Sequence, residues 1–234
     1  MPFFHFVYYF SFFHIVKWVN VMRIVIYDSG FGLIPFYEAL LKHKIYHTYF
    51  LEMEGEMFPL GEKSEKELKK YAYKKIEEWK EKRVDHVFIV CNTFSLILKK
   101  MNLISLPFKL HLIIDHSLAL LKNKDVTIIG TKRTTTYFKK EGYSVMNASR
   151  LVRFIEERNI KEIIKWIKKQ KIVTPYLLLG CTHFSHIAFL FFIYFPHLIL
   201  LDPYLSFLLD VPKGNHLKVY MNQKAEKTIK SFQN

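Results

Sequence analysis

Short apolar runs alternate with longer amphipathic ones from Met22 onward, and this alternation constrains the fold more than any other feature of the chain. Runs such as 126–130 and 176–180 are apolar throughout, which is typical of strands that are buried on both faces of a parallel sheet. The segments between them repeat apolar residues at helical spacing. The pattern therefore predicts an α/β protein whose parallel sheets are covered by helices on both faces.

Predicted strands and helices follow one another along this whole region. The predicted strands are 23–27, 46–51, 86–90, 110–114, 126–130, 176–180 and 198–201. The predicted helices are 33–43, 63–82, 93–101, 134–141, 149–157, 160–170 and 183–194. A further strand at 217–221 and a helix at 224–232 end the chain. We expect two α/β domains, one formed by 22–115 together with 202–234 and the other by 116–201, with no flexible linker between them.

Residues 1–21 are almost entirely apolar and aromatic. Their length is close to that of a membrane span, so a signal anchor is one interpretation. The segment has neither a basic leading region nor a small-residue cleavage site, and Met22 stands directly before a good strand. We therefore favour Met22 as the functional start and residues 1–21 as an upstream extension, and we expect no membrane contact unless that extension belongs to the working protein.

The net charge of +14 raises the question of an anionic partner. Lysines are interspersed with glutamates along 62–83, however, which is typical of a solvated helix face. We therefore expect no nucleic-acid binding, although a basic field helps to gather an anionic substrate. The chain has only two cysteines, ninety residues apart, which is no disulfide framework and indicates two free thiols in a reducing cytoplasm.

The two cysteines open similar segments at similar places. Residues 91–97 (CNTFSLI) and 181–187 (CTHFSHI) are identical at four of seven positions, and each follows a predicted strand. Ligands bind beyond the carboxyl ends of strands in such sheets, and a helix N-terminus is expected to lower the pKa of a thiol there. Two similar halves facing each other would present Cys91 and Cys181 to one cleft from opposite sides.

Two loops after predicted strands have the composition of ligand-binding turns. In the loop 28–32, Gly30 and Gly32 let backbone N–H groups approach a ligand, and Asp28 can receive an ammonium group or support a neighbouring base. The loop that begins at Gly130 repeats this arrangement with the hydroxyl of Thr131, which is suited to holding a carboxylate.

Together, these segments resemble the glutamate racemase family in order and spacing, from Met22 to the C-terminus. The matching segments are Asp28-Ser29-Gly30, Gly61-Glu62-Lys63-Ser64, Cys91-Asn92-Thr93, Gly130-Thr131 and Leu179-Gly180-Cys181-Thr182-His183. Asp202-Pro203 fits a late strand end of the family, and Glu156 fits an acidic residue of the second domain. Aspartate racemases of the same superfamily usually have Glu where His183 stands, so this residue indicates the glutamate branch.

The resemblance implies two facing α/β domains of similar topology with the active site in the cleft between them, and racemisation of glutamate by two thiols without cofactor or metal. Cys91 would deprotonate the D-isomer and Cys181 the L-isomer, assisted by Asp28, His183 and, more weakly, Glu156. The substrate-binding residues implied are Asp28, Ser29, Leu60, Gly61, Asn92, Thr93, Thr131, Thr134, Thr182 and His183. The implied role is the supply of D-glutamate for peptidoglycan in a bacterial cytoplasm, by a protein that can form homodimers.

Four positions depart from the family pattern. The family usually has Gly where Leu33 stands, Tyr at Leu60, Ser at Tyr137 and Pro at Ser185. The backbone amide at Leu60 can still donate a hydrogen bond, whereas Tyr137 adds bulk that we expect near the site. These departures affect the expected substrate and rate more than the expected fold.

Three other functions compete with this hypothesis. A zinc site could draw on Cys91, Cys181, His183 and His186, but residues 181 and 183 diverge by roughly 200° on a helix, which disfavours joint ligation. A related two-thiol racemase or isomerase could act on aspartate or another small acid. A catalytically diverged paralogue could instead bind a ligand or a macromolecule such as DNA or a topoisomerase, and the basic charge is compatible with that.

Overall fold

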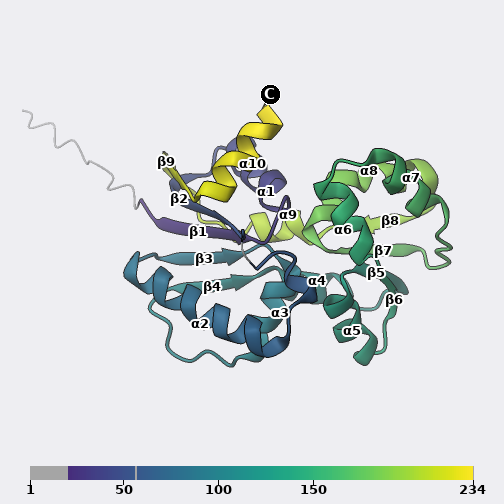
Figure 1. Ribbon diagram of the computed structural model, residues 1–234, viewed down its shortest axis with the longest axis horizontal. Coiled ribbons are helices and arrows are strands. Elements are labelled where there is room, and N and C mark those ends of the chain that lie inside the picture. The colour runs from purple at the N-terminus through teal and green to yellow at the C-terminus, as the bar shows by residue number, and fades with distance from the viewer. Residues whose placement is uncertain (1–20, 56, 234) are drawn as a thin grey trace, which may run out of the picture.

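Two parallel sheets form the centre of the molecule in the computed structural model, which describes residues 21–55 and 57–233 (Figure 1). One sheet has five strands in the order β4-β3-β1-β2-β9, and the other has four in the order β6-β5-β7-β8. Every strand pair in both sheets is parallel. The predicted fold class, an α/β protein with two parallel sheets, is confirmed.

The first lobe is built on the five-stranded sheet. Its strands are β1 (Arg23–Asp28), β2 (Tyr46–Met53), β3 (His86–Ile89), β4 (Lys109–Leu112) and β9 (Asn215–Met221). Its helices are α1 (Leu33–Lys42), η1 (Leu60–Glu62), α2 (Glu65–Glu81), α3 (Asn92–Lys100) and α10 (Gln223–Gln233). Helices α2 and α3 cover one face of the sheet, and α1 and α10 lie on the other (Figure 1).

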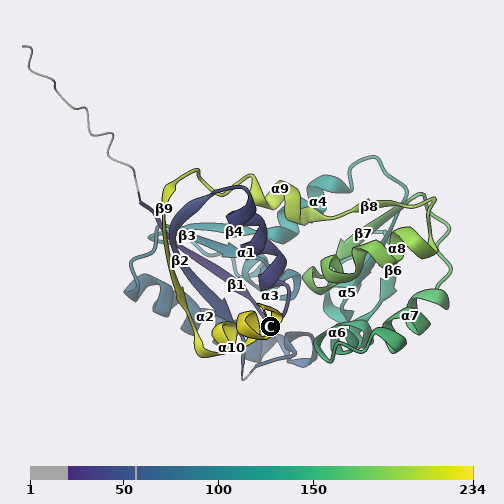
Figure 2. The ribbon, with the colours of Figure 1, turned by 90° about the horizontal axis from the view of Figure 1, so that it is seen from above.

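The second lobe is built on the four-stranded sheet. Its strands are β5 (Val126–Gly130), β6 (Ser144–Asn147), β7 (Tyr176–Gly180) and β8 (Ile199–Leu201). Its helices are α5 (Lys132–Lys140), α6 (Ser149–Glu156), α7 (Ile160–Lys168), η2 (Thr182–Ile187) and α8 (Ala188–Tyr194). Helices α4 (Ile113–Leu120) and α9 (Pro203–Leu208) pack against each other where the chain passes between the lobes (Figure 2).

Local chemistry accounts for the helix starts that border the site. Ser64 forms a capping box with Glu67: its hydroxyl accepts the Glu67 N–H, and the Glu67 carboxylate accepts the Ser64 N–H. Asp202 caps α9 by accepting the Tyr204 N–H, with Pro203 in the first helical turn. Cys91 and Thr131 are the N-cap residues of α3 and α5, which follow β3 and β5 along the chain. The strand-to-helix junctions therefore hold the polar side chains at one edge of each sheet.

The structure corrects several predicted elements. The strand predicted at 110–114 ends at Leu112, and α4 begins at Ile113. The predicted helix 183–194 consists of a 3-10 helix followed by α8. Strand β6 and helices α4 and α9 were not predicted. The interpretation of residues 1–21 falls almost wholly outside the described residues, and within the described part of the chain no helix is both long and apolar enough to cross a bilayer.

Candidate functional site

A cleft of about 1160 Å³ opens between the two lobes, and both cysteines line it. The first lobe contributes residues that follow β1 and β3, and the second contributes residues that follow β5 and β7. The carboxyl ends of parallel strands are the expected place for a ligand. The cleft is somewhat larger than the roughly 300–1,000 Å³ that is typical of small-molecule sites, so it has room for a small ligand.

Cys91 stands at the start of α3 and is only 5% exposed. Its Sγ lies 3.2 Å from the hydroxyl of Ser29. Burial and the nearby charge of Asp28 raise the pKa of the Cys91 thiol to about 12, against the opposing hydrogen bonds from Ser29 and from the Phe94 N–H. The expected lowering of this pKa by the helix N-terminus is therefore wrong, because the cost of desolvating a thiolate exceeds the gain from the helix dipole.

Cys181 stands beside a hydrogen-bonded pair of ionisable groups. Its Sγ lies 3.7 Å from Nδ1 of His183, and Nε2 of His183 lies 2.6 Å from Oε1 of Glu156. The same carboxylate oxygen accepts the N–H of Phe31 at 2.9 Å. Burial acts to lower the pKa of His183, but hydrogen bonds with Cys181 and Glu156 and the charge of Asp28 outweigh it and raise that pKa to about 10. This arrangement favours an imidazolium next to the thiol.

Asp28 is fully buried at the end of β1 and bonds across the lobes. Its Oδ1 accepts the N–H of Gly30 at 2.8 Å, and its Oδ2 accepts the hydroxyl of Thr182 at 2.8 Å. Burial raises the pKa of this carboxyl to about 6, although His183, the Gly30 N–H and Thr182 all act to lower it. Asp28 thus fixes Thr182, which lines the cleft next to Cys181.

Hydroxyl and amide groups converge on the wall near Cys91. The Thr93 and Thr131 hydroxyls, one from each lobe, lie 3.1 Å apart, and Thr134 lies 3.3 Å behind Thr131. Asn92 accepts the Ser117 hydroxyl on its Oδ1 at 3.3 Å. Its Nδ2 is buried and has no hydrogen-bond partner among the described residues. A buried amide donor without an acceptor is uncommon in proteins, so this group is placed to bind a ligand oxygen.

The structure brings nearly all of the sequence-predicted site residues to this cleft. Those that line it are Ser29, Leu60, Gly61, Cys91, Asn92, Thr93, Thr131, Glu156, Cys181, Thr182 and His183. Asp28 and Thr134 are both fully buried and contact lining residues from behind. Tyr137, which was expected near the site, lines a neighbouring cavity instead. Within residues 21–55 and 57–233, no group of three His, Cys, Asp or Glu side chains is arranged to hold a metal ion.

Sequence reasoning missed several residues of the site. Phe58 lines the cleft with its ring 6.4 Å from the ring of His183, and Ser117 supports Asn92 from α4. Arg150 and Arg153 also line the cleft, and Arg153 forms a 3.5 Å ion pair with Glu62 of the other lobe. None of these residues stands in a motif. The only sequence signal that could have found them is the pair of arginines at 150 and 153 near a predicted helix start, which suits anion binding.

Comparison with known proteins identifies glutamate racemases as relatives, although no family model matches the chain. The glutamate racemase of Helicobacter acinonychis is 27% identical over 226 residues, which cover 87% of each chain. That of Buchnera aphidicola subsp. Schizaphis graminum is 30% identical over 185 residues, covering 69% of this chain and 72% of the relative. The crystal structure of the Campylobacter jejuni glutamate racemase shares the fold with a TM-score of 0.72 at 22% identity, over 90% of this chain and 96% of the other. The Francisella tularensis glutamate racemase, solved in complex with D-glutamate, has a TM-score of 0.68 at 20% identity, over 91% and 94%.

Proposed function

Because the chain belongs to the glutamate racemase family, we propose that it interconverts L- and D-glutamate with two thiols as its acid and base. One observation carries this proposal: the only two cysteines of the chain are both buried and both line the cleft between the lobes. Each comes from a different lobe and has its own polar partner, Ser29 for Cys91 and His183 for Cys181. A substrate between the lobes would present opposite faces of its Cα to the two sulfur atoms.

In the proposed reaction, the thiolate of one cysteine removes the Cα proton of the amino acid. The electron pair of the broken C–H bond is delocalised into the substrate carboxylate, and the other cysteine donates its thiol proton to the opposite face. The enzyme is left with the protonation states of its two cysteines exchanged. As the family resemblance implies, Cys91 acts on the D-isomer and Cys181 on the L-isomer.

The Cα–H of an amino acid is a very weak acid, so the site must supply both a strong base and stabilisation of the carbanion. Burial raises the pKa of Cys91, which makes its thiolate a stronger base than an exposed one. The Asn92 amide is placed to donate hydrogen bonds to the developing negative charge on the carboxylate. The low exposure of Cys91 and Asn92, 5% and 3%, strengthens these interactions, because they lie in a region of low dielectric.

The His183–Glu156 pair gives the Cys181 side a distinct chemistry. An imidazolium next to Cys181 stabilises its thiolate, and it can return a proton when Cys181 acts as an acid. Glu156 does not contact the thiol in this arrangement; it positions His183 and stabilises its charge. Glu156 is therefore a positioning residue, and Asp28 has the same role through Thr182.

The basic residues that line the cleft favour an acidic substrate. Lys132, Arg150 and Arg153 all lie on the second-lobe side, and the Thr93 and Thr131 hydroxyls stand near Cys91. These groups suit an amino acid with a second carboxylate, bound at some distance from Cα. The D-glutamate formed would be used for peptidoglycan synthesis in a bacterial cytoplasm. Racemisation of aspartate is the alternative, because aspartate has the same charged groups as glutamate on a shorter side chain.

Circular dichroism of L- and D-glutamate and L- and D-aspartate, each incubated with the protein, tests the substrate directly. We expect loss of optical activity from both glutamate isomers at a kcat/KM well above that for aspartate. Conversion of aspartate without conversion of glutamate would identify aspartate as the substrate instead. A flat signal with all four compounds would contradict racemase activity and favour a diverged binding protein.

A further inference from the structure

A second cavity of about 590 Å³ lies next to the catalytic cleft and shares Gly61, Glu62 and Lys132 with it. Neither cysteine lines this cavity. One wall is formed by α5 of the second lobe. The other is formed by α3 together with the segment that runs from η1 into α2. The cavity therefore lies between the lobes, as the cleft does, but it is a separate site.

One side of helix α5 lines this cavity along its whole length. The lining positions of α5 and its C-terminal end are 132, 133, 136, 137, 140 and 141, which form two rows spaced by four residues. On the opposite wall, Leu96 and Ile97 of α3 border the cavity but are 1% and 0% exposed, and Lys100 lies one turn further on. Tyr137, at a position where the family usually has a small residue, adds an aromatic ring to the α5 wall. The walls thus combine an aromatic ring with a basic rim.

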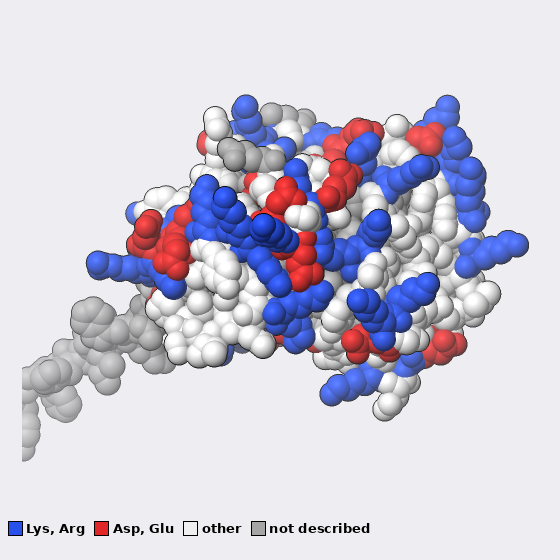
Figure 3. Space-filling model, turned by 60° about the horizontal axis from the view of Figure 1, so that its bottom comes forward, with Lys and Arg blue, Asp and Glu red and all other residues white. Residues whose placement is uncertain are grey.

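Positive charge exceeds negative charge around this cavity. The basic lining residues are Lys63, Lys100, Lys132, Arg133 and Lys140, and the acidic ones are Glu62, Glu65 and Glu141. Glu65 lies 3.6 Å from Lys100 and 3.9 Å from Arg133, at the long end for ion pairs. Lys132 and Lys140 form no ion pair within the described residues. Lys and Arg side chains predominate over Asp and Glu on this side of the molecule (Figure 3).

Arg133 provides the most specific feature of the cavity. Its Nη2 donates to the carbonyl of Lys63 at 2.5 Å, which orients the guanidinium from the second lobe toward the first. Its Nε is buried and has no hydrogen-bond partner among the described residues. A guanidinium group binds carboxylates and phosphates through paired N–H donors. An oxyanion in the cavity would satisfy this donor.

We propose that this cavity binds a small organic oxyanion with at least two negative charges, either phosphate or carboxylate groups. Arg133, Lys100 and Lys140 bind the charged groups, and the rest of the ligand packs on the ring of Tyr137. The ligand contacts both lobes and borders the catalytic cleft through Gly61 and Lys132. This inference does not depend on the substrate of the cleft, because the site has its own walls and charges.

Calorimetric titration of the full chain with inorganic pyrophosphate, and separately with citrate, tests the proposal. We expect binding of at least one of them in a one-to-one complex, and the tighter of the two identifies phosphate or carboxylate as the preferred chemistry. The double variant Lys100→Gln/Lys140→Gln should weaken the Kd about tenfold, because charge-assisted contacts are lost. Arg133→Lys, which keeps the charge but not the fork of donors, should also weaken binding.

Two double variants serve as controls. Lys122→Gln/Lys139→Gln removes the same charge from exposed positions that do not line the cavity, and Arg150→Gln/Arg153→Gln removes charge from the catalytic cleft alone. Both should leave the Kd within about twofold of the wild-type value. No binding of either anion would overturn the proposal. So would equal weakening in the Lys122/Lys139 control, which indicates nonspecific attraction, or loss of binding in the Arg150/Arg153 variant, which places the anion in the cleft.

Discussion

At the scale of single residues, Gly30 stands at a crowded point of the site. A Cβ added there would lie 2.6 Å from Nε2 of His183 and would collide with the Glu156 carboxylate. These two groups form the hydrogen-bonded pair next to Cys181. The need for glycine is steric: a side chain at position 30 and the His183–Glu156 pair cannot occupy the same space.

We expect Gly30→Ala to lower kcat about a hundredfold or more, since displacement of catalytic groups by about 1 Å has effects of that size. Gly55→Ala is the matched control, because a Cβ at Gly55 would meet no heavy atom within 4 Å. Steady-state racemisation assays on both variants provide the comparison. Similar activity of Gly30→Ala and the wild type would show that the His183–Glu156 pair is not needed in the observed position.

Asp28 gives a prediction on pH. Its pKa rises from 3.8 to about 6 on folding, chiefly through burial. Between these values the folded state binds more protons than the unfolded state, so the free energy of unfolding falls as pH rises through this window, by roughly 2 to 3 kcal/mol from this group. Asp28→Asn removes the titration and can still accept the Gly30 N–H, while its Nδ2 would donate to the Thr182 hydroxyl and so reverse that bond.

Urea unfolding of the wild type and of Asp28→Asn at several pH values between about 3.5 and 7 measures this effect. We expect the stability of the variant relative to the wild type to increase across the window and to level off above it. Parallel pH profiles for the two proteins would mean that the pKa of Asp28 does not change on folding, contrary to the account of its burial.

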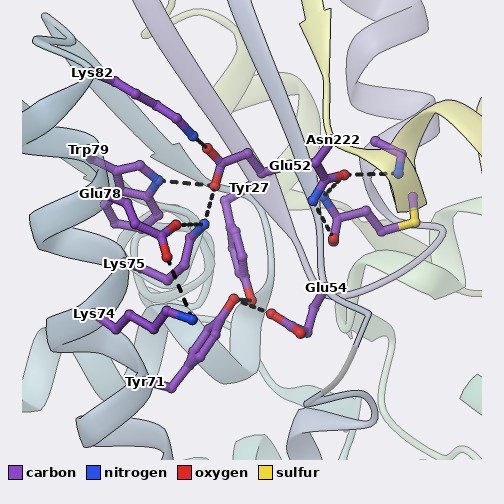
Figure 4. A network of polar contacts seen from close by, with 12 residues as sticks. Tyr27, Glu52, Glu54, Tyr71, Lys74, Lys75, Glu78, Trp79, Lys82 and Asn222 are labelled. Carbon is purple, nitrogen blue, oxygen red and sulfur yellow. Dashed lines mark hydrogen bonds and ion pairs between the residues drawn. The ribbon is translucent and has the colours of Figure 1, made fainter.

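At the scale of elements, α2 is fixed to the first sheet by buried charges (Figure 4). The Glu52 carboxylate on β2 lies 2.5 Å from Nζ of Lys75 and accepts the indole N–H of Trp79 at 3.2 Å, and Lys82 also pairs with it. Burial acts to raise the pKa of Glu52, but Lys75 and Lys82 outweigh this and lower it. Lys75 is 10% exposed and also bonds Glu78 at 2.7 Å.

We expect Glu52→Gln to lower the free energy of unfolding by about 3 kcal/mol, because it leaves buried lysine charge without its main partner. Glu77→Gln is the control: it breaks the exposed pair with Lys80, whose loss should change stability by less than about 1 kcal/mol. Chemical denaturation of both variants gives the two values. Equal, small losses would show that water reaches the Glu52 network.

The elements that the sequence predicted correctly are those with a strong apolar pattern. The strands 126–130 and 176–180 have the predicted bounds, and the last strand and helix are confirmed. Strand β6 escaped prediction because its residues are half-buried or exposed at a sheet edge. Helix α4 was missed because Ile113 and Ile114, both fully buried, read as the continuation of a strand. Helix α9 has only six residues, too few for a periodic pattern.

The candidate site was predictable where motifs follow strands and less so where it depends on packing. The sequence-predicted residues at positions 28, 91, 131 and 181 gather at one cleft because each ends or follows a strand of a parallel sheet. The direct bond between Glu156 and His183 was not foreseen, since it depends on how α6 lies against η2. The raised pKa of Cys91 was missed for a similar reason: burial is a property of the fold and not of the motif.

At the scale of the whole molecule, the site exists only where the lobes meet. Asp28 bonds Thr182, Phe31 bonds Glu156, and Thr93 contacts Thr131, each pair joining one lobe to the other. The C-terminal helix adds a further bridge on the far side of Phe31. Arg158 at the end of α6 donates to Ser231 of α10 and lies 4.3 Å from the Phe232 ring centroid, and Phe232 packs edge-on against Phe31.

The central claim is that one thiol from each lobe acts on opposite faces of the same Cα. The most direct measurement is the loss of the Cα proton of L- and D-glutamate in D₂O, followed by NMR for the wild type, Cys91→Ala and Cys181→Ala. We expect the wild type to exchange this proton and to interconvert the two isomers, and either substitution to abolish net conversion. Full racemisation by a variant that lacks one of the two thiols would contradict the two-thiol account.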